Sequence, residues 1–189
     1  NYGFTMDGTT AYAALGVGVS GSRIVKITGI GGTQVASEVM SPAAWSIATG
    51  VTSFTSFYGF GQSGTNLQFG DLSTGIWRVG KATGAISSYV SKADIIAVTG
   101  KTSISLATSS IVAPDGEETF YDSQSKNIFK STGAHAFTTL VTTAQLGTDT
   151  PSGGLGYDGP GNLYWCGAGT KAIYRLTPDG DLSVYRTKS

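Results

Sequence analysis

The 189-residue chain carries 12 Lys and Arg residues against 12 Asp and Glu residues, so its formal net charge is zero. Charged residues make up only 13% of it and form no basic cluster, which excludes a nucleic-acid binder that works by neutralising phosphates. A hydrophobic content of 40% is enough to form a core and excludes wholesale disorder. The length suits a single domain, which we expect over 1–189.

Taken in chain order, four segments repeat one pattern of short β-type runs separated by glycine turns. Each contains an isoleucine followed by a bulky residue and a base, and these isoleucines are spaced 52, 52 and 45 residues apart: Ile24, Ile76, Ile128 and Ile173. A turn dipeptide and another β-type run precede each isoleucine, and a further run follows it. The segments cover approximately 2–40, 54–91, 108–142 and 153–187.

The turn dipeptides predict hairpins, because glycine accepts a positive φ and Asp or Ser bonds back to the local backbone. They are Asp7-Gly8, Ser63-Gly64, Asp115-Gly116 and Asp158-Gly159. Four strands repeated every 45 to 52 residues are typical of a β-propeller blade. We therefore predict an all-β fold of four four-stranded antiparallel blades. Helical periodicity is nearly absent, so the connections 40–56, 91–108 and 143–154 are expected to be long loops.

The fourth unit, from Gly154 to Gly180, reads GLGYDGPGNLY and then IYRLTPDG. It resembles blades of the NHL, gluconolactonase/strictosidine-synthase-like and virginiamycin B lyase-like propellers. That resemblance implies a ring of six or seven blades, with activity that rests on central carboxylates around a divalent metal or on a histidine.

Four blades leave three arrangements open. They can close as a four-bladed ring, form an arc completed by a second chain or a homo-oligomer, or belong to a longer single-chain propeller. Closure by four blades is the arrangement that we favour.

Cellular setting follows from composition and from the single cysteine. Cys166 excludes an intrachain disulfide, and its apolar neighbours predict a buried thiol. No run approaches the length of a membrane span. Low charge with abundant Gly, Ser and Thr favours a secreted or cell-surface protein, and a start at Asn1 suggests a processed or partial chain.

Ligand binding is expected on the face that carries the three long loops, since binding residues concentrate on loops. Trp45, Phe57 and Tyr58 lie in or beside the first loop, and Asp71 and Asp122 end the second strands of two blades. Aromatic and hydroxyl groups suit a glycan, and a protein surface is the other ligand class. The alternative is that Phe57 and Tyr58 belong to an inner strand and that Trp45 packs at the blade edge.

Catalytic residues are not assigned. His135 is the only histidine and is expected to be a solvated turn residue, so no triad can be assembled. We therefore predict a non-enzymatic binding module without a cofactor. One alternative is a metal-dependent hydrolase or lyase with calcium near Asp71 and Asp122. A second is a structural assembly element.

A basic residue lies two positions after each repeated isoleucine. We interpret these residues as structural, with their charged groups hydrogen-bonded to turns. They are Lys26, Arg78, Lys130 and Arg175.

Overall fold

A computed structural model describes residues 3–16, 22–52, 54, 57–106 and 110–187. It contains four antiparallel sheets of four strands each, and in every sheet the strands follow the order of the sequence. The first two sheets are β1 (Gly3–Asp7), β2 (Thr10–Leu15), β3 (Arg23–Thr28) and β4 (Val35–Met40), then β5 (Phe57–Ser63), β6 (Asn66–Asp71), β7 (Gly75–Gly80) and β8 (Ile86–Ser91).

The last two sheets are β9 (Ser110–Val112), β10 (Glu118–Asp122), β11 (Asn127–Gly133) and β12 (Ala136–Val141), then β13 (Pro151–Tyr157), β14 (Leu163–Gly167), β15 (Ile173–Leu176) and β16 (Leu182–Arg186). The predicted all-β propeller fold with four-stranded antiparallel blades is therefore confirmed.

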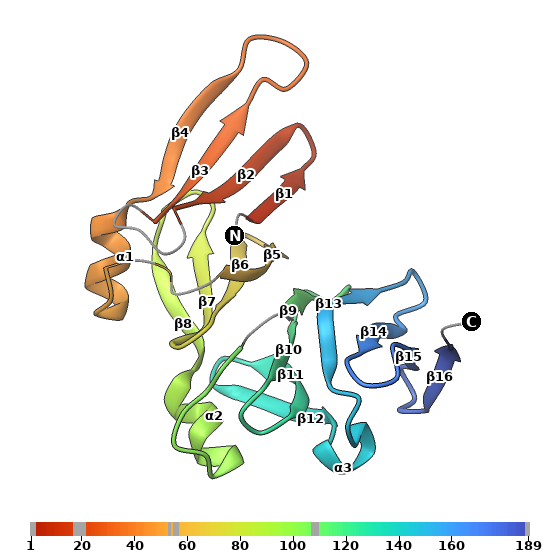
Figure 1. Ribbon diagram of the computed structural model, residues 1–189. Helices are drawn as coiled ribbons and strands as arrows, with labels where there is room; N and C mark the ends of the chain where they lie inside the picture. The colour runs from red at the N-terminus through yellow and green to blue at the C-terminus, as the bar shows by residue number, and fades with distance from the viewer. Residues whose placement is uncertain (1–2, 17–21, 53, 55–56, 107–109, 188–189) are drawn as a thin grey trace.

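The four blades form an open arc (Figure 1). The first strand of each sheet packs beside the first strand of the next, from β1 to β5, β9 and β13. The β1–β4 and β13–β16 sheets lie at opposite ends of the arc, so closure by four blades is wrong for this chain and the arc alternative holds.

Short helices occupy the three connections that the sequence analysis treated as loops, and this corrects that prediction. They are α1 (Pro42–Thr49), α2 (Lys92–Thr99) and α3 (Thr143–Leu146). Each follows a hydroxyl N-cap, at Ser41, Ser91 or Thr142, which satisfies a free amide of the first turn. At eight residues or fewer they are too short to show helical periodicity. In the described part of the chain, no helix is both long and apolar enough to cross a membrane.

The core lies between the sheets, and the repeated isoleucine marks it. Ile24, Ile76 and Ile128 are fully buried, whereas Ile173 in the last sheet is only partly buried. Each helix adds one buried apolar residue four positions after its cap: Trp45, Ile95 and Leu146. The sequence repeat therefore records the packing of one blade on the next.

Candidate functional site

The face that carries the helices has a concave surface between the end of α1, the β6–β7 turn and the start of α2. We call it the α1–α2 hollow. Its volume is about 500 Å³, and its lining residues are Thr49, Val51, Ser73, Thr74, Trp77, Ser88, Ser91, Lys92 and Ala93. The hollow lies on the face where the sequence predicted ligand binding, because both the helices and the β6–β7 turn follow strands that run toward that face.

The lining combines an aromatic ring with hydroxyl groups. The indole nitrogen of Trp77 donates to Thr74 Oγ1 over 2.9 Å, and Thr74 Oγ1 donates to Asp71 Oδ1 over 2.8 Å. The hydroxyl of Thr49 donates to the carbonyl of Trp45. Ser88 differs, because its buried Oγ has no hydrogen-bond partner in the described structure. An unpaired buried hydroxyl costs free energy until a water or a ligand supplies a partner.

The aromatic residues predicted at the rim lie in the core behind the hollow. Trp45 is fully buried, with its ring centroid 5.3 Å from that of Trp77 and 4.7 Å from that of Phe54. Phe57 is buried at the start of β5, and Tyr58 follows it, half-buried, in the same inner strand. Trp77 is the aromatic residue that reaches the hollow. In the sequence, Trp77 is marked only as the bulky residue that follows the repeated Ile76.

Asp71 and Asp122 are fully buried, and each closes the turn after its own strand. Asp71 accepts hydrogen bonds from the amide and the hydroxyl of Thr74. Asp122 accepts from the amides of Ser105 and Ser125, over 2.8 and 2.9 Å. Within the described residues, no three His, Cys, Asp or Glu side chains are grouped so that they could hold a metal ion.

Asp149 performs the same role for the fourth sheet. It accepts from the hydroxyl of Tyr174 and the amide of Thr170, both over 2.6 Å. These two bonds, the one from Tyr174 first, hold the pKa of Asp149 below its ordinary value. The carboxylates on this face are therefore turn-closing groups.

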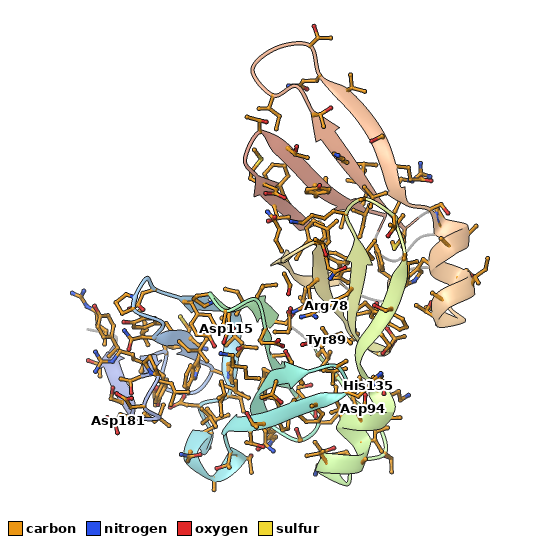
Figure 2. The ribbon with its side chains drawn as sticks, turned by 180° about the vertical axis from the view of Figure 1, so that it is seen from behind. Arg78, Tyr89, Asp94, Asp115, His135 and Asp181 are labelled. Atoms are coloured by element: carbon orange, nitrogen blue, oxygen red, sulfur yellow. The ribbon has the colours of Figure 1, made fainter. Side chains whose placement is uncertain are left out.

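His135 is exposed in the turn between β11 and β12, as expected, and it also joins the third sheet to the second. Its Nδ1 lies 2.8 Å from Asp94 Oδ2, and its amide donates to the carbonyl of Tyr89 over 2.6 Å. Figure 2 shows the His135 and Asp94 side chains beside each other. Burial raises the pKa of Asp94, but hydrogen bonds from His135 and Ser91 outweigh that effect and hold it below its ordinary value.

A polar network links the second and third sheets on the side of the hairpin turns that join the first two strands of each sheet. The guanidinium carbon of Arg78 lies 3.3 Å from the ring centroid of Tyr89 (Figure 2). Arg78 also donates to Gln68 and to Ser63 in the hairpin turn. Gln68 in turn donates to Glu118 Oε2 over 2.9 Å.

Arg78 and Lys130 thus make the turn contacts expected of the repeated bases, since Lys130 pairs with Asp115 of a hairpin over 2.5 Å.

Glu118 could not be recognised from the sequence, because a glutamate in a β-type run is typical of a solvent-facing position. It is fully buried, and burial raises its pKa to about 8.

Cys166 is exposed on the outer side of β14, which corrects the expectation of a buried thiol. The reason is the open arc: within the described residues, no other sheet packs on that side of the fourth sheet.

No family model matches the chain, and no curated protein matches it. Solved structures do. Virginiamycin B lyase from Staphylococcus aureus is 14% identical over 98% of this chain and 55% of its own, with a TM-score of 0.62. A streptogramin B lyase structure is 16% identical over 100% and 55%, with a TM-score of 0.65. An extracellular domain of a two-component system from Bacteroides thetaiotaomicron is 10% identical over 98% and 22%, with a TM-score of 0.58.

These likenesses confirm the resemblance to virginiamycin B lyase-like propellers at the level of the fold. Sequence identities this low show that the fold is shared. They do not show that this chain shares the activity of those proteins. The chain spans about half the length of the two lyases that it matches.

Proposed function

We propose that this chain is a non-enzymatic, extracellular propeller module that binds a neutral polar ligand, with a glycan as the favoured class, in the α1–α2 hollow. The observation that carries the proposal is that Trp77 and the unpartnered hydroxyl of Ser88 line one concave surface. Small-ligand sites are concave, largely apolar surfaces with a few converging polar groups.

A sugar matches this lining in two ways. Its apolar C–H face covers an aromatic surface, while its hydroxyls bond to side-chain oxygens such as those of Ser73 and Ser91. Lys92 adds a cationic donor at the exposed edge of the hollow. A protein surface that inserts a polar side chain is the other ligand class that we predicted. It would use the same residues.

The acidic side chains are already hydrogen-bonded to other groups of the protein, which supports a non-enzymatic role. Asp71, Asp122 and Asp149 each receive at least two hydrogen bonds from turn residues, and His135 is paired with Asp94. A general acid or base must exchange protons with a substrate, which a carboxylate held in a turn does poorly. The extracellular setting rests on composition and on the fold likeness to an extracellular domain.

The test is a glycan array followed by titration calorimetry with the best ligand. Ala93→Trp fills the hollow from an exposed position at the start of α2, and we expect it to weaken binding at least tenfold. Ala97→Trp is the matched control, because Ala97 is exposed in the same helix but does not line the hollow. Silence on the array, or equal effects of the two variants, contradicts the proposal.

A further inference from the structure

We propose that a groove between the first and second sheets is a separate binding site for a small carboxylate ligand that carries hydroxyl groups, such as a sugar acid. The groove is lined by Lys26 of β3, by residues 37–39 of β4 and by residues 81–84 of the hairpin that joins β7 to β8. Its volume is about 390 Å³, and we call it the hairpin groove. It lies at the opposite ends of these strands from the α1–α2 hollow, and the inference is independent of the ligand proposed there.

The hairpin groove forms where the second sheet packs on a bulge of the first. The register of β3 with β4 shifts between Ile24 and Val25, which leaves Val39 as an extra residue in β4. The β7–β8 hairpin rests against this bulge, because a Cβ on Gly84 would collide with the carbonyl oxygen of Val39. That close backbone contact holds the two walls of the groove in place before any ligand arrives.

In the second and third sheets, the repeated base is paired at a hairpin turn. Arg78 donates to Ser63 over 3.1 Å and lies 4.0 Å from the carboxylate of Glu117. Lys130 lies 2.5 Å from Asp115. Both cations therefore have a carboxylate of the chain within ion-pair distance, and neither leaves a positive charge for a ligand to balance.

Lys26 is different, because a lysine of the second sheet occupies the hairpin aspartate beside it. Asp7 has the same position in the first hairpin as Ser63 in the second, since each pairs with the residue three positions later. The ammonium of Lys81 donates to Asp7 over 2.8 Å and to Gln62 over 2.6 Å. Among the residues that the structure describes, none is a hydrogen-bond or ion-pair partner of the Lys26 ammonium.

The glutamate that borders the groove does not supply the missing partner. Glu38 pairs with Val25, whereas Lys26 lies one residue further along β3. Successive side chains of a strand alternate between its two sides, so the Glu38 carboxylate and the Lys26 ammonium project from opposite sides of the sheet. The Glu38 carboxylate lies 3.8 Å from Arg23. Lys26 lies opposite Tyr12, whose ring is in the core that the first two sheets share.

The hairpin groove therefore has one positive charge that the described chain does not balance, carried by the partly buried Lys26. One such charge favours a ligand with a single negative charge.

Two hydroxyl groups border the same groove and favour a ligand with hydroxyls of its own. Ser37 is the cross-strand partner of Lys26, so its hydroxyl and the ammonium lie on one side of the sheet. Thr83 Oγ1 accepts from the amide of Ala85 over 3.2 Å, which leaves its hydroxyl proton to donate. A carboxylate would pair with Lys26 while neighbouring hydroxyls bond to Ser37 and Thr83. The groove volume is within the range of small-ligand sites.

The first experiment is an NMR titration of the isotope-labelled chain with glucuronate, and with glucose as its neutral counterpart. Glucuronate is expected to shift the amide signals of Ser37 and Thr83, to bind about fivefold or more tightly than glucose, and to bind more weakly as salt is added. The amides of Ser73 and Ser91 report separately on the α1–α2 hollow, so the two sites are tested independently. Equal affinity for the two sugars, or no shift at Ser37 and Thr83, overturns the proposal.

The second experiment removes the charge of Lys26. Lys26→Met keeps the apolar stem of the side chain and should abolish the preference for glucuronate over glucose. Lys101→Met is the control, because it removes the same charge from an exposed lysine that does not line the groove. An equal loss of preference in the two variants overturns the proposal, and circular dichroism checks that both are folded.

The third experiment keeps Lys26 and gives it a carboxylate of the chain. Ser37→Asp places this group directly across from Lys26, so it should compete with glucuronate and weaken its binding by about fivefold or more. Ser87→Asp is the matched control, because Ser87 lies across from the repeated base Arg78 in the second sheet and does not line the groove. It should bind glucuronate as the unmodified chain does. Undiminished binding by Ser37→Asp, or an equal loss in Ser87→Asp, overturns the proposal.

Discussion

The carboxylate of Asp149 fills the space in front of Gly167: its Oδ1 lies 2.9 Å from the point that a Cβ on Gly167 would occupy. Gly167 follows Cys166 at the end of β14, where the second and third sheets have Asp71 and Asp122. The fourth sheet therefore has a turn-closing carboxylate at the same position as the other two sheets, but this carboxylate belongs to the connection after β12. Because the position is filled by a carboxylate from a different segment, we infer that the group has a structural role.

Exchanging the residues at positions 149 and 167 tests that structural role. Asp149→Gly should lower the melting temperature, because the amide of Thr170 and the hydroxyl of Tyr174 lose their acceptor. Gly167→Asp alone should also lower it, since the new side chain meets Asp149 and Tyr174. The double variant should recover part of the loss in a thermal double-mutant cycle. Strict additivity of the two single effects would contradict the shared role.

Glu118 predicts an unusual dependence of stability on pH. Its pKa is raised to about 8 in the fold, from an ordinary 4.5, so between these values the folded chain binds more protons than the unfolded chain. The free energy of unfolding should therefore fall as pH rises through that window, by on the order of a few kcal/mol in total.

Glu118→Gln removes this titration and should be more stable than the unmodified chain at pH 9, while it keeps an acceptor for Gln68. Urea unfolding across the pH range provides the measurement. Glu38→Gln, at an exposed glutamate of β4, is the control and should keep the slope of the unmodified chain. An unchanged slope in Glu118→Gln would show that another group titrates.

The His135–Asp94 pair predicts acid sensitivity of the contact between the second and third sheets. The pKa of Asp94 is lowered in the fold, so its contribution is fully present above the ordinary aspartate pKa and is lost as pH falls through the lowered value. Asp94→Asn should shift acid unfolding to higher pH.

His135→Gly should have a smaller effect than Asp94→Asn. His135 has a φ of 60°, which glycine adopts without strain, and an exposed ion pair contributes roughly 1 kcal/mol or less. Asp94 also accepts from the amide and hydroxyl of Ser91 in the capping box of α2, which is worth about 1 kcal/mol more. A larger loss from His135→Gly would mean that the imidazole has a further role.

The melting temperature with and without calcium distinguishes the binding proposal from the hydrolase or lyase alternative. Millimolar calcium should leave the melting temperature unchanged, because the oxygens of Asp71 and Asp122 are occupied by turn hydrogen bonds. Asp71→Asn should lower the melting temperature by the same amount with and without calcium. A calcium-dependent rise that Asp71→Asn or Asp122→Asn abolishes would favour the metal-dependent enzyme instead.

The helices show where local signals were present but too short to recognise. Their hydroxyl caps recur at Ser41, Ser91 and Thr142, and each is followed four residues later by a buried apolar residue. That spacing repeats with the blades and was available in the sequence. Periodicity failed to detect it, because a helix of eight residues or fewer completes too few turns.

The sequence by itself determined the blades, because their signals are local. Gly8, Gly64 and Gly116 lie at positive φ in the predicted hairpin turns, and three of the four repeated isoleucines lie buried between sheets. Only the tertiary structure decided that Trp77, rather than Trp45, reaches a concave surface and that Glu118 is buried. Only it decided that the four blades form an open arc. These outcomes depend on the angle and contact between neighbouring sheets, which no single segment of the chain encodes.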